Sequence, residues 1–215
     1  LGAAQGFLGW YMVKSGLARD PEVSHYRLAT HLGLAFAVFG LAWWTILDLR
    51  RPQESSEAPK SMRRWAIVLL VVLCLQVTYG AFTSGLKAGY GFNTFPKMES
   101  DWVPDALFTL TPYWKNFLED RFTVQFIHRW LGTILVLATA GLGWLAIRSG
   151  KLSDRQRRSV SWLLGLAVTQ FCLGVATLVL VVPIPLAIVH QLVALLLFAA
   201  FLSFIHSLGK STHEQ

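Results

Sequence analysis

Five apolar runs constrain the fold of this chain more than any other feature. Each is about 20 residues long, the length a helix needs to cross a bilayer, and each is bounded by charged residues or proline. Hydrophobic residues make up 54% of the sequence and charged residues 14%, unlike an ordinary soluble domain. We therefore predict an all-α integral membrane protein with spans at residues 26–47, 65–86, 122–147, 160–182 and 185–208.

A sixth apolar run, residues 1–13, is too short to span a membrane. It has no initiating methionine, basic amino-terminal region or small-residue cleavage site, so it does not resemble a signal peptide. We expect it to be the end of a helix that begins upstream. On this interpretation the chain is N-terminally incomplete and holds five complete spans and one partial span.

Basic residues gather in the two links at residues 48–64 and 148–158, and the positive-inside rule places such links on the inner side of the membrane. The long connection at residues 87–121 balances its few basic residues with acidic ones, so we place it on the outer side. The formal net charge of +7 therefore reflects topology, and it requires no nucleic-acid partner.

Three histidines share one predicted layer of the membrane. His31, His128 and His190 each lie five to seven residues from the outer end of a span, roughly 8–10 Å deep at 1.5 Å per residue. A single intramembrane histidine is often bonded only to a neighbouring carbonyl, whereas three at one depth favour a shared function. We expect the other histidines, His25, His206 and His213, to be solvated or interfacial.

Imidazoles on facing helices are suited to clamp a haem iron from both sides. A zinc site needs three or four ligands, and the spans contain hardly any carboxylate. A copper site through methionine is disfavoured because Met12, Met62 and Met98 lie outside the histidine layer. Cys74 and Cys172 lack metal or redox spacing, so we expect them to be buried packing residues. Haem is the favoured ligand.

A glutamine followed four residues later by glycine occurs before each of these histidines, as Gln5 and Gly9, Gln76 and Gly80, and Gln170 and Gly174. The ordinary explanation is a small-residue helix contact with a polar bond across it. The repeat also predicts pseudo-symmetric four-helix bundles, one complete and one partial. We assign residues 1–50 to the second half of an N-terminal unit, 51–64 to an inner-side linker, 65–209 to a complete C-terminal unit and 210–215 to a tail.

Several longer strings give the chain a specific resemblance. GWYMVKSGL at residues 9–17, SHYRLATHLGLAF at 24–36, GLKAGYGFNTFPKM at 85–98, HRWLG at 128–132 and VPIPLAIVHQ at 182–191 resemble haem A synthase. They are most similar to its mitochondrial and proteobacterial branch, and the resemblance covers nearly the whole chain.

The resemblance implies oxidation of a ring methyl of haem O to the formyl group of haem A, for cytochrome oxidase biogenesis. It implies that His128 and His190 ligate haem b as a cofactor and that His31 binds the substrate haem O. The second substrate-side histidine and the suspected catalytic acidic residue would lie upstream of Leu1, so this chain alone is a fragment that need not be active. Arg129 beside His128, and Arg27 near His31, are candidates to bind haem propionates, with cations snorkelling to the interface as the alternative.

The resemblance also implies a place in the bacterial plasma membrane or the mitochondrial inner membrane, with the basic loops and the C-terminus on the cytoplasmic or matrix side. An electron acceptor is required, and haem O synthase, oxidase assembly factors and a homo-oligomer stay open as partners beside membrane lipid. The main alternative function is a bis-histidine b-type cytochrome that only transfers electrons. A transporter is disfavoured because these repeats preserve orientation. The aromatic outer connection, residues 89–121, is either a cap over the haem site or a lid without chemistry.

Overall fold

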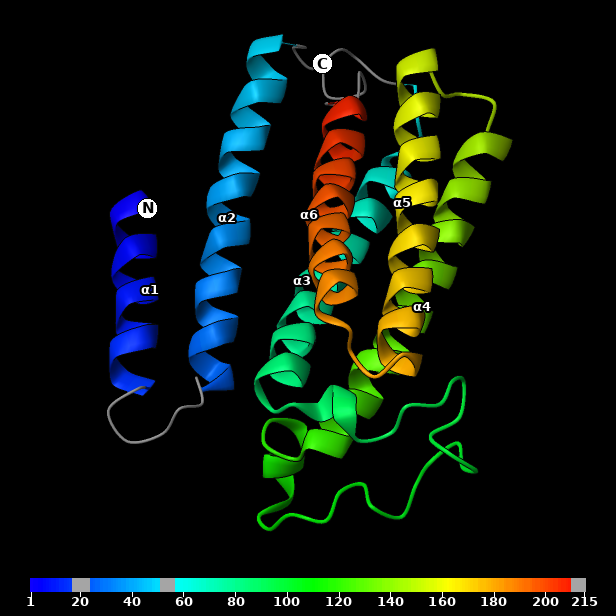
Figure 1. The fold of residues 1–215 in the computed structure, drawn as a ribbon. Coiled ribbons are helices and arrows are strands. Elements are labelled where there is room, and N and C mark those ends of the chain that lie inside the picture. Colours follow the sequence, from blue (N-terminus) through cyan, green and yellow to red (C-terminus); the bar gives the residue numbers. More distant parts are fainter. Residues whose placement is uncertain (17–23, 51–56, 210–215) are drawn as a thin grey trace.

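The computed structural model describes residues 1–16, 24–50 and 57–209, and within these ranges the chain is helical without a named strand. The predicted tail at 210–215, His213 and Arg51 lie outside the described residues. Figure 1 shows tall, roughly parallel helices with one long irregular connection at the lower end. The six α-helices are α1 (Gly2–Gly16), α2 (His25–Arg50), α3 (Lys60–Gly85), α4 (Arg121–Arg148), α5 (Asp154–Val179) and α6 (Ile184–Ser207).

Five of these helices, α2 to α6, are long and apolar enough to cross a membrane, which confirms the predicted number of spans and the all-α membrane fold. Each has 24 to 28 residues, and the helices continue past the apolar runs into their charged ends. At 1.5 Å per residue, about 26 residues span roughly 39 Å, enough for the hydrocarbon core and part of each interface. Residues 60–64, which we assigned to a linker, are therefore the first turn of α3.

The helix ends sort into two levels. The turn between α5 and α6 and the long connection between α3 and α4 lie at the lower end of Figure 1, whereas the α4–α5 link lies at the upper end. The lower end is the one that the distribution of basic residues predicts to be outside. We call it the outer end below, and the sidedness itself remains a prediction.

Residues that are typical of helix starts stand at the beginning of α4, α5 and α6. Asp120 caps α4 by accepting hydrogen bonds from the backbone N–H groups of Phe122 and Thr123. Ser153 and Gln156 form a reciprocal capping box at the start of α5. Pro183 precedes α6, where the absence of a backbone N–H costs nothing.

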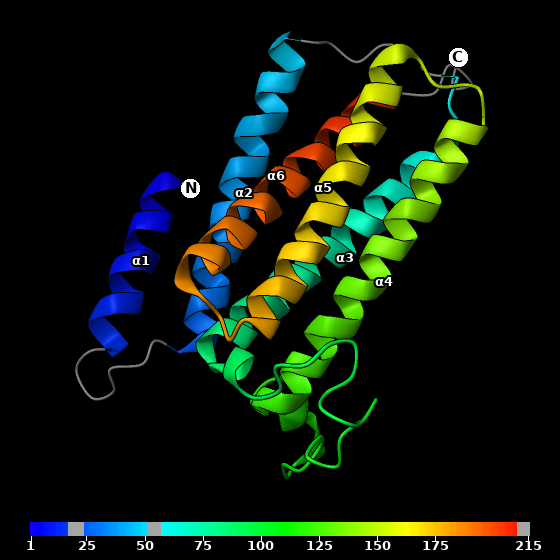
Figure 2. The ribbon, with the colours of Figure 1, turned by 45° about the vertical axis from the view of Figure 1, so that its right-hand side comes forward.

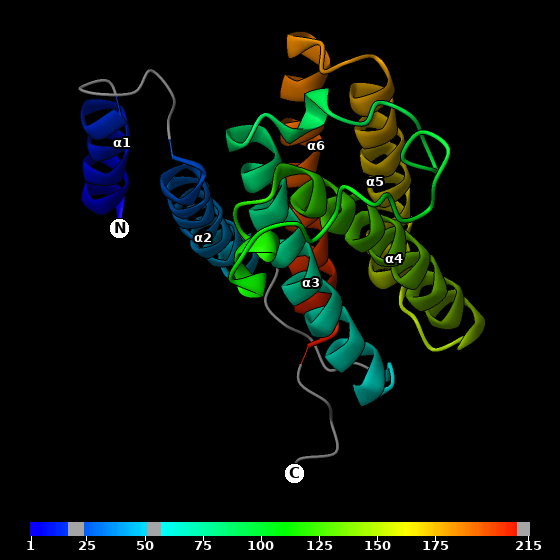
Figure 3. The ribbon, with the colours of Figure 1, turned by 90° about the horizontal axis from the view of Figure 1, so that it is seen from below.

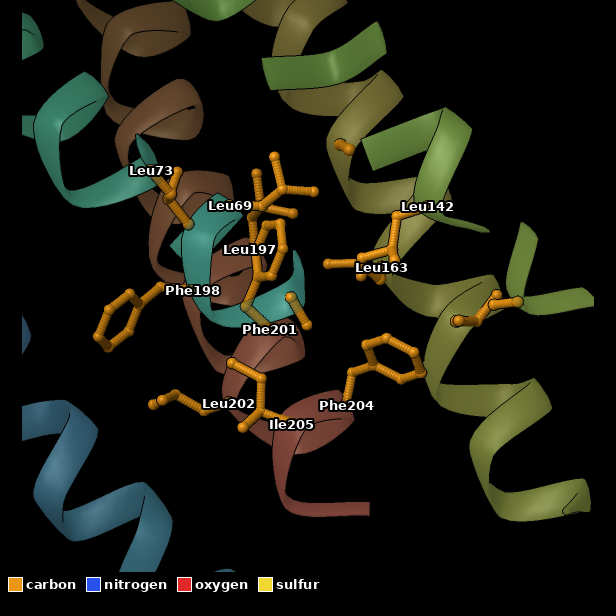
Figure 4. Close-up of a cluster of buried hydrophobic side chains, with 14 of the residues drawn as sticks. Leu69, Leu73, Leu142, Leu163, Leu197, Phe198, Phe201, Leu202, Phe204 and Ile205 are labelled. Carbon is orange, nitrogen blue, oxygen red and sulfur yellow. The ribbon is translucent and has the colours of Figure 1, made fainter. Parts of the chain in front are cut away.

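Helix α6 is the centre of the packing and contacts α2, α3 and α5. Its side chains point in several directions from one ribbon: Phe198 and Leu202 lie on one side and Phe204 on the other (Figure 4). Phe201 and Phe204 are fully buried. Leucines from α3, α4 and α5 complete this apolar core, namely Leu69, Leu73, Leu142 and Leu163.

Helix α1 is placed differently from the rest. It packs beside α2 at the edge of the molecule in all three ribbon views (Figures 1, 2 and 3). Phe7 and Trp10 on this helix are 61% and 53% exposed. Helix α2 in turn packs against α3 and α6, so it connects α1 to the group formed by α3 to α6.

Candidate functional site

The three predicted ligand histidines occupy equivalent places in three helices that run the same way. His31, His128 and His190 lie six or seven residues after the first residue of α2, α4 and α6. All three helices begin at the outer end (Figure 1). The histidines are therefore set at similar depths below that end, as their spacing in the sequence predicts.

The pair α3 and α4 shows how such a histidine is held. Gln76 lies on α3 with its amide nitrogen Nε2 3.4 Å from His128 Nε2, and the same amide donates a 3.0 Å hydrogen bond to the backbone carbonyl of His128. One turn along α3, a Cβ placed on Gly80 would lie 3.2 Å from the ring atom Cε1 of His128. A Cβ placed on Gly132 would likewise lie 2.9 Å from Nε2 of Gln76, so this glycine leaves room for the amide. Glycine is needed at these places because the rings and amides approach the backbone so closely.

The other two helix pairs repeat this arrangement. In α1 and α2, Gln5 Nε2 lies 3.4 Å from His31 Nε2 and donates a 3.2 Å hydrogen bond to the His31 carbonyl. A Cβ placed on Gly9 would lie 3.1 Å from Cε1 of the His31 ring. In α5 and α6, Gln170 Nε2 lies 3.4 Å from His190 Nε2. A Cβ placed on Gly174 would lie 3.0 Å from Cε1 of the His190 ring. We call each glutamine, glycine and histidine set a ligand-holding unit.

The structure thus explains the repeated motif, and the sequence predicted only part of this explanation. We expected a small-residue helix contact with a polar bond across it, and both features are present. The sequence did not show that the glycine and the glutamine meet the same histidine. Because residues four apart lie on one face of a helix, the spacing itself was the available signal.

The ring nitrogens of these histidines are suited to ligate iron. Nδ1 of His31, His128 and His190 is buried without a hydrogen-bond partner of normal geometry, and Nε2 has only the long contact from the glutamine amide. A neutral imidazole whose ring nitrogen is not engaged in a strong hydrogen bond is a good ligand for haem iron. His128 and His190 belong to α4 and α6 of the α3–α6 group and lie at similar depths. The C-terminal pair is therefore our candidate to hold one ligand with two imidazoles.

Arg129, a predicted propionate contact, has a different partner in the structure. Its guanidinium is buried and donates through Nη1 to the carbonyls of Thr94 and Lys97 and through Nη2 to the carbonyl of Phe92. The arginine therefore fastens the outer connection to α4, directly beside His128. Its Nε is buried and makes no hydrogen bond.

Gln125, one turn before Arg129, was missed by sequence reasoning. It is 1% exposed, and its amide donates to the carbonyls of Ala88 and Phe92. Asn93 extends the same attachment to α5 by donating a 2.8 Å hydrogen bond to the carbonyl of Leu178. A polar residue in the first turns of an apolar span was the only signal for Gln125 in the sequence.

The outer connection therefore lies across the outer ends of α4 and α5 as a fixed structure. Its short 3₁₀ helices, η1 (Ala88–Tyr90) and η2 (Tyr113–Phe117), both contact α4. Trp102, Tyr113 and Trp114 are more than half exposed, which is expected of aromatic residues at a membrane interface. This arrangement is compatible with a cap over His128.

Arg27, the other predicted propionate contact, lies on the first turn of α2. Its guanidinium stacks over the ring of Tyr11 on α1, 5.1 Å from the centroid. Arg27 precedes His31 by one turn, so it lies between this histidine and the outer end of the helix. The structure thus places it on the outer side of the α1–α2 ligand-holding unit.

Two expectations about other residues were wrong, whereas a third agrees with the structure. His25, expected to be solvated or interfacial, is the partly exposed first residue of α2 and packs edge-on against Phe82. His206 is instead completely buried and bonds to Asp48 and Arg155 at the inner end of α6. Cys74 and Cys172 are exposed on the outside of the helices, where lipid would surround them.

Comparisons with known proteins agree with this arrangement. The family model described as "Cytochrome oxidase assembly protein" (COX15-CtaA) matches residues 1–202. A protein named "Heme A synthase" from Nitrosospira multiformis is 43% identical over 213 residues, covering 98% of this chain and 60% of that protein. One of the same name from Parvibaculum lavamentivorans is 41% identical over 98% of this chain and 59% of its own length.

A mammalian relative shows the same similarity. "Heme A synthase COX15" from Bos taurus is 41% identical over 96% of this chain and 52% of its own length. The chain thus spans about half to three-fifths of the curated relatives that it matches. The family match covers almost the whole chain, including all three ligand-holding units. This chain belongs to the COX15-CtaA family of cytochrome oxidase assembly proteins.

Proposed function

We propose that the protein containing this chain is a haem A synthase, which oxidises a ring methyl of haem O to a formyl group. The observation that carries the proposal is the threefold repeat of the ligand-holding unit, in which a glutamine and a glycine of one helix face a histidine of the next. The names of the relatives support it, since several at about 40% identity are called heme A synthase.

We assign haem b to His128 and His190. These two residues belong to four helices that pack against one another, and they lie at similar depths in helices that run the same way. A bis-histidine haem in such a bundle supplies an iron that accepts and donates single electrons. The role of the chain is to hold both rings by Gln76 and Gln170, and to keep water out with the fastened outer connection.

We assign the substrate haem O to His31. Its unit is formed by α1 and α2, and α2 connects it to the α3–α6 group. Arg27 is our candidate for a propionate of this substrate, because it lies one turn closer to the outer end. We withdraw that role for Arg129, whose terminal nitrogens already serve backbone carbonyls.

Oxidation of a methyl to a formyl group, with water as the oxygen source, releases electrons and an equal number of protons. The reaction therefore needs an electron acceptor as a partner, and its product would serve cytochrome oxidase assembly. We place the site near the outer face of a bacterial plasma membrane or a mitochondrial inner membrane, because the inner-end links carry most of the basic residues.

The test is to express the full-length protein in a host that makes haem O but has no haem A synthase of its own. Haem extracted from these cells should contain haem A, and the purified protein should show the absorbance of a bis-histidine haem b. Haem b without any haem A, in cells shown to contain haem O, would overturn the proposal in favour of an electron-transfer cytochrome.

A further inference from the structure

Three polar side chains join α2, α5 and α6 at the inner end, far from the ligand histidines. His206 on α6 is completely buried, and its Nε2 lies 2.9 Å from the carboxylate oxygen Oδ1 of Asp48 on α2. Its other nitrogen, Nδ1, lies 3.2 Å from Nη2 of Arg155 on α5. Sequence reasoning had assigned none of the three a function. We call them the inner-end triad.

The chemistry of the triad allows only one arrangement of protons. A guanidinium can only donate and an ionised carboxylate can only accept, so Nδ1 accepts from Arg155 and Nε2–H donates to Asp48. The His206 ring is therefore neutral and satisfied on both nitrogens. If α2 or α5 slid along α6, the fully buried imidazole would lose a hydrogen-bond partner, which is unfavourable. The triad is consequently sensitive to the register of the helices.

The contact continues outward along α2 and α6. Trp43 donates a 3.0 Å hydrogen bond from Nε1 to the hydroxyl of Ser203. Farther along, a Cβ on Gly40 would lie 3.0 Å from the ring of Phe198, so the helices approach closely there. At the outer end, by contrast, the bond from Tyr26 goes to Glu119 of the outer connection, and it is exposed and 3.4 Å long. Among the described residues, the side-chain hydrogen bonds between α2 and α6 are thus in the inner half, whereas the outer end of α2 packs against Phe82 and Gly85 of α3.

Register at the inner end determines the level of the histidines at the outer end. His31 lies 17 residues before Asp48, and His190 lies 16 residues before His206. At 1.5 Å per residue, pairing Asp48 with His206 places His31 and His190 within about 1.5 Å of the same level. A slip by one turn would separate these levels by about 5.4 Å.

We infer that Asp48, His206 and Arg155 are positioning residues that set the level of the His31 site relative to the His128–His190 site. The significance of this spacing rests on the proposed function, since two haems exchanging electrons need a fixed separation. The geometric part of the inference does not depend on that function.

The experiment measures the distance between the outer halves of α2 and α6 in the purified full-length protein. Cys74 and Cys172 are first replaced by serine, and spin labels are placed at the exposed positions Thr30 and Ile188. Asp48→Ala is the main variant, because the Asp48 side chain is 52% exposed and its loss leaves the core intact. His206→Ala is the second variant. Asp48→Asn keeps an acceptor oxygen and serves as the rescue.

We expect Asp48→Ala and His206→Ala to shift or broaden the Thr30–Ile188 distance by about 1.5–5 Å, one residue to one turn. Haem b absorbance should be retained, while haem A formation should fall on the order of tenfold to a hundredfold, the effect of an ångström-scale misplacement. Asp48→Asn should restore most of both readouts. Arg158→Gln, an exposed change on the same end of α5, should alter neither.

An unchanged distance distribution in Asp48→Ala would overturn the inference, and an unchanged distribution in a folded His206→Ala protein would do the same. If the distance shifts although the unsubstituted protein makes no haem A, the positioning role stands and the proposed function fails. The two failures are therefore distinguishable.

Discussion

The α1–α2 pair and the α3–α6 group contain the same ligand-holding unit in different surroundings. Gln5, Gly9 and His31 reproduce the distances of the two C-terminal copies to within about 0.2 Å, an agreement that helix geometry explains. Yet the C-terminal copies lie in four mutually packed helices, whereas α1 packs beside α2 at the edge (Figure 3). The same short sequence pattern therefore holds a histidine in both regions, and the two sets differ in the helices that surround them.

The difference in surroundings is also a difference in burial. Phe201 and Phe204 of α6 have no exposed surface, whereas Phe7 and Trp10 of α1 are more than half exposed. Under the proposed function, the haem of the C-terminal group is a resident cofactor and the ligand of the His31 unit is a substrate. The predictions below test this contrast, from the largest expected effect to the smallest.

Bulky residues in place of the unit glycines should have the largest effect. Gly80→Leu would drive a side chain into the His128 ring, because a Cβ alone lies 3.2 Å from Cε1. We expect near-complete loss of haem b from the purified protein, measured by its absorbance. Gly9→Leu should leave haem b in place and reduce haem A formation instead.

The matched controls for these variants are Gly141→Leu and Gly6→Leu, at which an added Cβ meets nothing within 4 Å. Both should keep haem b and product formation. Equal loss of haem b in Gly9→Leu and Gly80→Leu would contradict the assignment of different ligands to the two regions.

Removal of the glutamine amides should have a smaller effect on the same ligand. Gln76→Leu and Gln170→Leu delete the groups beside His128 and His190, and such supporting residues usually contribute 10–100-fold in affinity. Haem titration of the apoprotein should show this loss, together with a changed reduction potential. Gln5→Leu is the internal control, and equal weakening of haem b by this change would contradict the assignment.

Release of the outer connection should weaken the protein locally. Arg129→Gln removes the guanidinium that donates to the carbonyls of Phe92, Thr94 and Lys97. We expect the free energy that holds the connection in place to fall by about 1–3 kcal/mol, because three hydrogen bonds from a charged group are removed. Limited proteolysis should then cut near residues 92–97, with Arg121→Gln as an exposed control on the same helix. An uncut connection would show that Arg129 is not its main attachment.

The smallest effect should come from the contact between the two regions. Trp43→Phe deletes one hydrogen bond to Ser203 and keeps an aromatic ring, so we expect a loss of about 0.5–1.5 kcal/mol in the free energy of unfolding. Thermal unfolding of the detergent-solubilised protein measures it, with Trp144→Phe, an exposed tryptophan on α4, as the control. Equal destabilisation by both changes would mean that the α2–α6 hydrogen bond contributes nothing specific.

The spans, the histidine layer and the family could be predicted from the sequence, because apolar run length and residue spacing translate directly into helices and depth. The partners of single polar residues could not. His206 and Arg129 sit in helix ends that look interfacial in a linear sequence, and only packing shows that one is fully buried and the other fastened to a distant loop. Such contacts join residues 32 to 158 positions apart, a separation that no local pattern encodes.

The most direct test of the account replaces each unit histidine by alanine in the full-length protein and measures haem b and haem A in the same preparations. His128→Ala and His190→Ala should each remove the haem b absorbance. His31→Ala should keep haem b in full and abolish haem A formation. Full haem b in either C-terminal variant, or undiminished haem A in His31→Ala, would contradict the division of the protein into a cofactor site and a substrate site.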